Sequence, residues 1–288
     1  MQRIKHITAA LVSIALFSVL FSSCHAENNQ VSAFILNNSE DEEATSLEST
    51  KLYENLVYQY KEDENASKIA AVTVNGVTYE GEYYLTSVVP TAMYLKDWYQ
   101  TKDGSVQFSL ERDTGNLGEY LYHITENEPN PIFSVEECRD IAEDFVRNYF
   151  NLSEYVLVEI KESDRLCGFI YKKYLNEMET EENFIVSVRK SQGHIATFST
   201  QMTGRFPNKL AKSTVNSIDS LKKRAPKVIK EKIASEFPDC KRYEIDSERL
   251  CLLPDGSYGM KYKIKTFYET KKAVEIYGNS FDMVVKFD

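Results

Sequence analysis

Residues 134–145 read SVEECRDIAEDF, and this stretch determines the fold expected for the C-terminal half of the 288-residue chain. Ser134 followed by Glu137 is a capping box, which satisfies two otherwise unpaired amides at the start of a helix. Apolar residues then recur at helical spacing from Val135 to Tyr149. The stretch therefore predicts an amphipathic helix with one buried face.

Runs typical of β-strands follow this helix: YVLVEIK, LCGFIYKKYL and NFIVSVRKSQGHIATFS. The same order returns near the C-terminus, where the helical SIDSLKKRAPKVIKEKIASEF precedes further strands, ending in SFDMVVKFD. Pro226 lies in the middle of the second helix, at a cost of about 3 kcal/mol, so we expect a kink or a fresh helix start there. The pattern predicts an α+β fold with two tandem modules, residues 132–206 and 214–288, each of one helix packed on an antiparallel sheet.

A pentapeptide is nearly repeated, as SDRLC at residues 163–167 and SERLC at residues 247–251. Its serine lies 29 positions after Ser134 in the first module and 30 positions after Ser217 in the second. Because helix start and pentapeptide keep their distance, we interpret the repeat as a landmark of a duplicated fold and not as a paired active site.

Residues 51–128 have the pattern of a β-rich N-terminal domain. Asn75-Gly76 lies between two β-branched runs, which is the strongest short signal for a β-hairpin. Pro129 and Pro131 then indicate a boundary before the first module.

The N-terminus has the pattern of an export signal. Arg3 and Lys5 precede an uncharged apolar run over residues 7–21, which is short for a membrane span. The ending LFSSC is similar to a bacterial lipoprotein signal. That resemblance implies that residues 1–23 are removed and that Cys24 receives lipid, which would attach the protein to the membrane.

Residues 24–50 are acidic and rich in Asn and Ser, so we expect a flexible linker. The lipid on Cys24 would place the chain on the extracytoplasmic face of the cell membrane. The alternative is cleavage after Ala26, which would give a freely secreted protein.

The first module resembles PepSY-like domains, a family of one helix followed by strands. The resemblance is carried by SVEECRDIAEDF at residues 134–145 and by VSVRKSQGHI at residues 186–195. The second module keeps the order of elements but lacks the closing glycine hairpin. The resemblance implies an extracytoplasmic, non-catalytic module of the kind found in peptidase propeptides, which inhibits peptidases or binds other proteins.

Four cysteines besides Cys24 are an even number, as expected for disulfides in an exported chain. Cys138 lies on the apolar helix face and Cys167 begins a strand that this helix should cover, while Cys240 and Cys251 could close a smaller loop. The alternative is four buried thiols that act as small apolar side chains. The chain has no Cys-x-x-Cys, so we expect no metal site.

The bulk charge and the motifs exclude several functions. A formal net charge of −10 argues against nucleic acid as a partner. No G-x-S-x-G, H-E-x-x-H or phosphate-binding glycine loop is present, so we expect no enzyme and no cofactor. A cryptic hydrolase built on two carboxylates stays open as an alternative, because such a pair leaves no sequence signature.

The strand MKYKIKTFY places Lys261, Lys263 and Lys265 on one face. They are either a polyanion-binding stripe or the outer face of a half-buried strand. We expect a membrane-anchored lipoprotein that binds a protein partner, with a peptidase as the specific candidate. The alternative is a structural protein of the cell envelope that binds wall polymers through the lysine strand.

Overall fold

The structure is a computed structural model. It describes the following residues: 52–53, 59–88, 94–123, 131–253, 255–269 and 275–286. The predicted signal peptide 1–23, the lipid-bearing Cys24 and the linker 24–50 lie outside the described residues. Among the residues that are described, no helix is long and apolar enough to cross a membrane.

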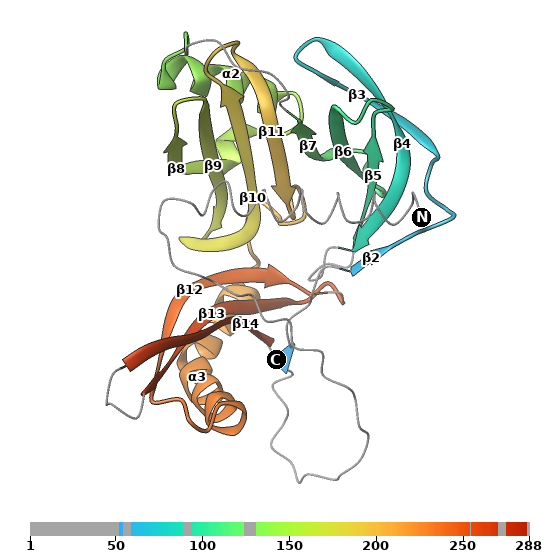
Figure 1. The fold of residues 1–288 in the computed structure, drawn as a ribbon. Coiled ribbons are helices and arrows are strands. Elements are labelled where there is room, and N and C mark those ends of the chain that lie inside the picture. The colour runs from blue at the N-terminus through green and yellow to red at the C-terminus, as the bar shows by residue number, and fades with distance from the viewer. Residues whose placement is uncertain are drawn as a thin grey trace. The chain divides into compact units, whose positions relative to one another are not determined.

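The first part of the described chain, from β2 to β7, is a run of antiparallel strands (Figure 1). Neighbouring strands from β4 to β7 pair in sequence order, β3 forms a hairpin with β4, and β2 pairs with the far end of β4. The hairpin between β3 and β4 turns at Asn75-Gly76, where both residues have positive φ. The strands are β2 Gln59–Lys61, β3 Ile69–Val74, β4 Val77–Val88, β5 Leu95–Gln100, β6 Val106–Glu111 and β7 Leu117–Tyr122.

One helix and four antiparallel strands follow, in the predicted order. The helix α2 (Val135–Arg147) begins at the capping box, since Ser134 and Glu137 bond each other as expected. After the short helix η1 (Leu152–Glu154), the strands pair in the order β8-β9-β10-β11. Their bounds are β8 Tyr155–Glu162, β9 Leu166–Leu175, β10 Met178–Arg189 and β11 His194–Gln201.

The first core lies under α2 and continues into the N-terminal strands. Cys138, Ala142 and Val146 of α2 are buried in one cluster with Phe184 of β10 and Phe108 of β6. Strand β11 pairs with β7, so one sheet joins the two regions. The β-rich N-terminal segment and the first helix-plus-sheet unit therefore share a core, while a domain boundary between residues 128 and 132 stays a prediction.

The second helix-plus-sheet unit packs around a second core cluster, to which Tyr94, Leu175 and Met202 from the preceding part of the chain also belong. Figure 1 shows α3 (Lys212–Glu236) against strands β12 Arg242–Leu252, β13 Tyr258–Glu269 and β14 Glu275–Lys286. The short strand β1 (Leu52–Tyr53) pairs with β14. Ile218, Leu221, Ala225, Ile229 and Ile233 of α3 are buried, as the helical spacing predicts. The predicted α+β class, with a β-rich segment before the helix-plus-sheet units, is confirmed.

Three local expectations differ from the structure. The second helix, predicted to begin at Ser217, begins at Lys212. A single helix runs through Pro226, so the predicted fresh start is wrong, while a kink at Pro226 stays a prediction. The stretches RYEID and LCLL, expected as separate strands, form the one strand β12, which has a bulge between Ile245 and Ser247. The bulge absorbs the extra residue without ending the strand.

The interpretation of the pentapeptide as an equivalent landmark is wrong. SDRLC spans the turn before β9, where the Ser163 amide donates to the Leu166 carbonyl, while SERLC lies inside β12. Cys167 packs under α2 in the first core. In β12 it is Leu250 that packs in the core with α3, while Cys251 belongs to a separate cluster. The two copies therefore present opposite residues to their helices.

Candidate functional site

An open groove of about 620 Å³ lies between α2, η1, β8 and β9. We name it the α2–β8 groove. Its lining combines two arginines and one glutamate of α2 with a wall of aromatic and aliphatic side chains. The lining residues are Arg139, Glu143, Arg147, Phe150, Asn151, Leu152, Ser153, Tyr155, Leu157 and Tyr171.

The charged side of the groove is arranged around Glu143. Arg139 and Arg147 lie four residues before and after it, so all three side chains share one helix face. The Arg139 Nε lies 2.8 Å from the Glu143 Oε1, and the Arg147 Nη2 lies 3.0 Å from its Oε2. The hydroxyl of Tyr171 donates a further hydrogen bond of 3.0 Å to the Glu143 Oε1.

Glu143 is held in its charged form. Burial acts to raise the pKa of this carboxyl, but the hydrogen bonds from Arg139 and Tyr171 outweigh it and lower the pKa below its ordinary value. The side chains of Arg139 and Arg147 remain about half exposed, at 48% and 54%. Two guanidiniums and one carboxylate give the charged lining a net charge of +1.

The opposite wall is aromatic and rests on the first core. The Tyr171 ring stacks on Phe184 with centroids 4.8 Å apart, and the Tyr155 ring meets the same residue edge-on at 5.0 Å. The Phe150 ring also stacks on Phe184, with centroids 5.9 Å apart. Because Phe184 is fully buried, these rings have a fixed support and form a preformed apolar wall.

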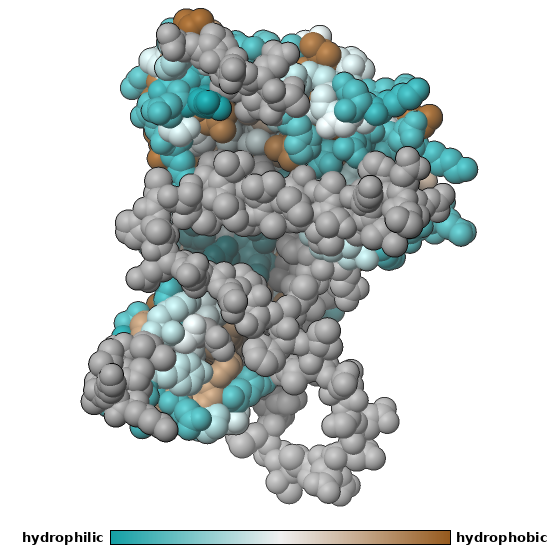
Figure 2. Space-filling view, in the orientation of Figure 1, coloured by the Kyte–Doolittle hydropathy of each residue, from teal (hydrophilic) through white to brown (hydrophobic). Residues whose placement is uncertain are grey.

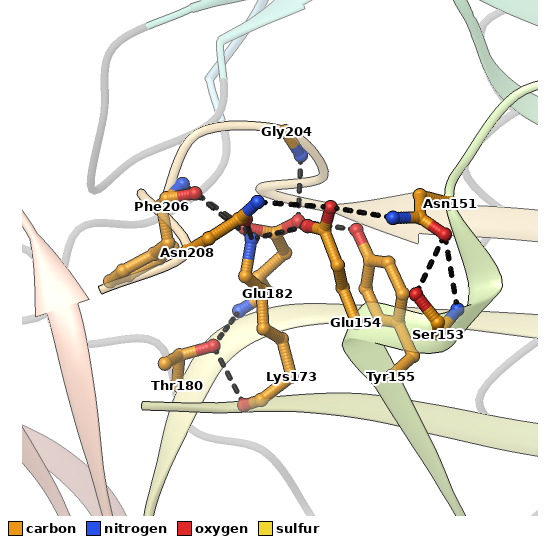
Figure 3. A network of polar contacts seen from close by, with 10 residues as sticks. All are labelled: Asn151, Ser153, Glu154, Tyr155, Lys173, Thr180, Glu182, Gly204, Phe206 and Asn208. Carbon is orange, nitrogen blue, oxygen red and sulfur yellow. Dashed lines mark hydrogen bonds and ion pairs between the residues drawn. The ribbon is translucent and has the colours of Figure 1, made fainter. Parts of the chain in front are cut away.

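A buried polar network fixes one end of the groove (Figure 3). The hydroxyl of Tyr155 donates to the Glu182 Oε1, and the amides of Gly204 and Phe206 donate to the same carboxylate at 2.7 and 3.0 Å. Glu182 is fully buried, so these three donors replace the water that its charge would otherwise need. The pKa of Tyr155 is raised, first by its burial and then by the charge of Glu182.

Lys173 completes this network from β9. Its Nζ lies 3.7 Å from the Glu182 Oε2 and 3.0 Å from the Glu154 Oε2 of η1, and it donates to the Phe206 carbonyl at 3.0 Å. The hydrogen bond from Lys173 is the largest of the effects that lower the pKa of Glu154. The lysine thus ties η1, and with it one end of the groove, to the loop after β11.

Strand β8 forms the rim of the groove and the edge of its sheet. Of the described strands, only β9 pairs with β8. Tyr155 and Leu157 face the groove, while Val156, Val158 and Ile160 are exposed, at 53%, 39% and 46%. Among the coloured residues of the face drawn in Figure 2, most are hydrophilic, and the hydrophobic ones form small separate patches. The half of β8 beside the groove exposes aliphatic side chains, while the half after the bulge between Leu157 and Glu159 carries charged residues.

The structure brings one predicted cysteine pair together and separates the other. Cys138 and Cys167 are buried side by side between α2 and β9, each affecting the pKa of the other. Cys240 packs at the margin of the second core, whereas Cys251 lies in a different cluster. All four are free thiols in this structure, and the disulfides stay a prediction.

The lysine strand is largely neutralised by acids. The Lys261 Nζ lies 3.1 Å from both the Glu181 Oε1 and the Asp282 Oδ2. The Lys265 Nζ lies 2.6 Å from an oxygen of Asp246, and Lys263 is exposed. This arrangement suits a solvated strand face better than a stripe of unpaired cations. Among the described residues, no cluster of His, Cys, Asp and Glu could hold a metal ion.

Sequence reasoning missed the α2–β8 groove, although two signals for it exist. Arg139, Glu143 and Arg147 form an R-x-x-x-E-x-x-x-R pattern on the predicted helix, which marks one charged face. The strand YVLVEIK has apolar residues at consecutive positions, and consecutive residues point to opposite faces of a strand. If only one face of the sheet is covered, some of these apolar side chains must be exposed. Neither signal shows by itself that helix and strand meet.

Comparison with known proteins identifies the family. The chain is similar to the Bacillus megaterium YpeB C-terminal domain, with 13% identity over 80% of this chain and 90% of that one, and a TM-score of 0.33. No curated protein matches. The model of the YcdB, YcdC repeated domain matches residues 53–202, more than half of the 288 residues. The chain therefore belongs to the YcdB, YcdC repeated domain family.

Proposed function

We propose that the protein is an exported, non-catalytic binding module, attached by lipid on Cys24 to the outer face of the cell membrane, which binds a partner protein along β8. The observation that carries this proposal is the edge strand itself. Val156, Val158 and Ile160 are exposed on a strand that has one described neighbour, and the strand borders an open groove.

An unpaired strand edge offers a row of backbone donors and acceptors. A partner segment that adds to the sheet there gains main-chain hydrogen bonds, and its alternate side chains meet the exposed aliphatic residues. This mode of binding needs no catalytic group, in agreement with the absence of catalytic motifs from the sequence.

The partner that we propose is an exported peptidase, which the protein inhibits or regulates. Support comes from the resemblance of residues 134–145 and 186–195 to PepSY-like domains. Edge-strand pairing also agrees with it, because a segment of a partner protein can bind the sheet in extended form.

The test compares two valine variants in an inhibition assay. Full-length protein is added to the exported peptidases of the same cells, and cleavage of a fluorescent protein substrate is measured. We expect inhibition by the native protein, loss of inhibition with Val158→Lys, and full inhibition with the control Val77→Lys. Val77 is a similarly exposed strand valine, at 49%, outside the groove. Equal peptidase activity with and without the native protein would contradict the regulatory role.

The membrane attachment has a separate test. Replacing Cys24 by Ser should remove lipid labelling and move the protein from the membrane fraction to the medium or the soluble extract. Retention of the Cys24→Ser variant in the membrane fraction would show that another part of the chain supplies the attachment.

A further inference from the structure

We infer that the α2–β8 groove binds the C-terminal end of an extended peptide. In this arrangement β8 pairs with the peptide main chain, Arg139 and Arg147 bind the terminal carboxylate, and the aromatic wall takes an apolar last side chain. The inference rests on the proposed function and specifies the chemistry that the binding surface recognises.

The direction of β8 places the peptide terminus at the groove. The strand runs from Tyr155, which lines the groove, to Glu162, which does not. A peptide that pairs in the antiparallel sense, the more stable one, runs the opposite way and therefore ends near Tyr155. β8 has a bulge between Leu157 and Glu159, so the regular stretch that a peptide end can pair with beside the groove is Tyr155–Leu157.

Arg139 and Arg147 have more N–H donors than their hydrogen bonds to Glu143 and Asp144 use, so they can also bind a peptide carboxylate. A guanidinium carries five N–H donors. Arg139 uses its Nε for Glu143, and Arg147 uses one terminal nitrogen for Glu143 and the other for Asp144. Glu143 fixes the two side chains on either side of it, so they are oriented before a ligand arrives. A carboxylate bound by the N–H groups that Glu143 and Asp144 do not use would form charge-assisted hydrogen bonds, which are stronger than neutral ones.

The uncharged part of the groove lining determines which kind of last side chain the peptide can have. Phe150, Leu152, Leu157 and the rings of Tyr155 and Tyr171 make the uncharged wall. A lining with a net charge of only +1 and a large apolar share suits a singly charged carboxylate next to an aromatic or aliphatic group. It suits a phosphate poorly, because that group would carry about two negative charges against one net positive charge.

The experiment uses three labelled peptides and the full-length protein. The first is fluorescein-Lys-Thr-Val-Thr-Val-Phe with a free terminal carboxylate, the second is its C-terminal amide, and the third is the amide extended by one Glu. Binding is measured by fluorescence anisotropy. We expect the free acid to bind at least about tenfold more tightly than the amide, as charge-assisted hydrogen bonds to one carboxylate would give.

Variants of the two groove arginines test whether the preference for the free carboxylate arises in the α2–β8 groove. Arg139→Gln and Arg147→Gln should each weaken binding of the acid more than binding of the amide, so the preference for the acid falls. Both side chains are about half exposed, so the fold should tolerate these changes. Arg165→Gln is the matched control, because Arg165 is an exposed arginine in the turn that follows β8, away from the groove.

The outcomes separate this inference from the proposed function. Equal affinity for acid and amide would overturn carboxylate recognition and leave strand pairing at β8 intact. Equal affinity for the acid and the Glu-extended amide would overturn recognition of a terminus in favour of a side-chain carboxylate. Failure of all three peptides to bind at concentrations on the order of 1 mM would overturn the inference, while the peptidase assay with Val158→Lys still decides the proposed function.

Discussion

Cys138 of α2 and Cys167 of β9 lie side by side in the first core, and both side chains are fully shielded from solvent. Burial, followed by the neighbouring Cys167, raises the pKa of the Cys138 thiol to about 12. Burial also raises the pKa of Cys167 and Cys251. Since the thiolate is the reactive form, these groups are inert near neutral pH while the fold is intact.

We therefore expect iodoacetamide at pH 8 to modify Cys240 first in the native protein, because it is the most accessible of the four described thiols. Cys138, Cys167 and Cys251 should react only after unfolding in urea. Mass spectrometry of the peptides measures each rate. Native Cys138 that reacts as fast as Cys240 would contradict the packing of α2, and linked peptides of Cys138 and Cys167 would show that the predicted disulfide forms.

Breaking the ion-pair network of Lys173, Glu154 and Glu182 at the end of the groove should lower the free energy of unfolding. Replacing Lys173 by Met leaves the fully buried Glu182 without its cation, and we expect a loss of about 3–5 kcal/mol in the free energy of unfolding. Its neighbour Lys172 is the control, because its ion pair with Glu179 is partly exposed. Lys172→Met should cost at most about 1 kcal/mol. Urea titration measures both, and equal losses would show that burial of the Lys173 pair is unimportant.

Glu154 gives the network a pH dependence. The pKa of Glu154 is lowered in the folded protein, mainly by the hydrogen bond from Lys173, whereas the unfolded chain has a value of about 4.3. The folded state therefore binds this proton more weakly. The stability that the carboxylate contributes is fully present above about pH 4.3 and is lost as the pH falls through the folded pKa.

The variant Glu154→Gln isolates this contribution. We expect it to be less stable than the native protein by a constant amount above about pH 5.5, and we expect the difference to shrink below about pH 4. Urea titrations at several pH values measure the difference. Glu159→Gln is the control, since Glu159 is an exposed glutamate on the neighbouring strand β8. A difference that grows on acidification would mean that the pKa of Glu154 is raised and not lowered.

The sequence predicted those parts of the fold that depend on local pattern. The capping box at Ser134 and the apolar spacing of α2 and α3 each involve residues a few positions apart, so one chain segment contains the whole signal. The turn at Asn75-Gly76 is of the same kind.

The pentapeptide shows where such reasoning fails. Its serine lies 29 positions after Ser134, the N-cap of α2, and 30 positions after Ser217, which lies inside α3 because that helix begins at Lys212. The similar spacing therefore did not compare two helix starts. Side chains alternate between the faces of a strand, so the last two residues of the pentapeptide point to opposite faces. Cys167 packs with α2, whereas in β12 the residue before the cysteine, Leu250, packs with α3.

The groove could not be predicted because it depends on contacts between distant segments. Tyr171 reaches Glu143 across 28 positions, and Glu182 accepts from Gly204 across 22. A sequence shows the polar type of each of these residues but not which pairs meet, since that follows from how α2 and the loop after β11 pack on the sheet.

Pro226 offers a test of how much α3 depends on packing. The proline has no N–H, so the carbonyl of Lys222 lacks its usual helical donor, and Pro226 itself is exposed. Changing it to Ala should restore that hydrogen bond, and the gain of about 3 kcal/mol is reduced by about 1 kcal/mol because the unfolded chain becomes more flexible. We expect a net increase of about 2 kcal/mol in the free energy of unfolding, measured by urea titration. Lys230→Ala, at another exposed position of α3, should change it by only a few tenths of a kcal/mol. A decrease with Pro226→Ala would mean that the buried face, from Ile218 to Ile233, needs the curvature that the proline imposes on the helix.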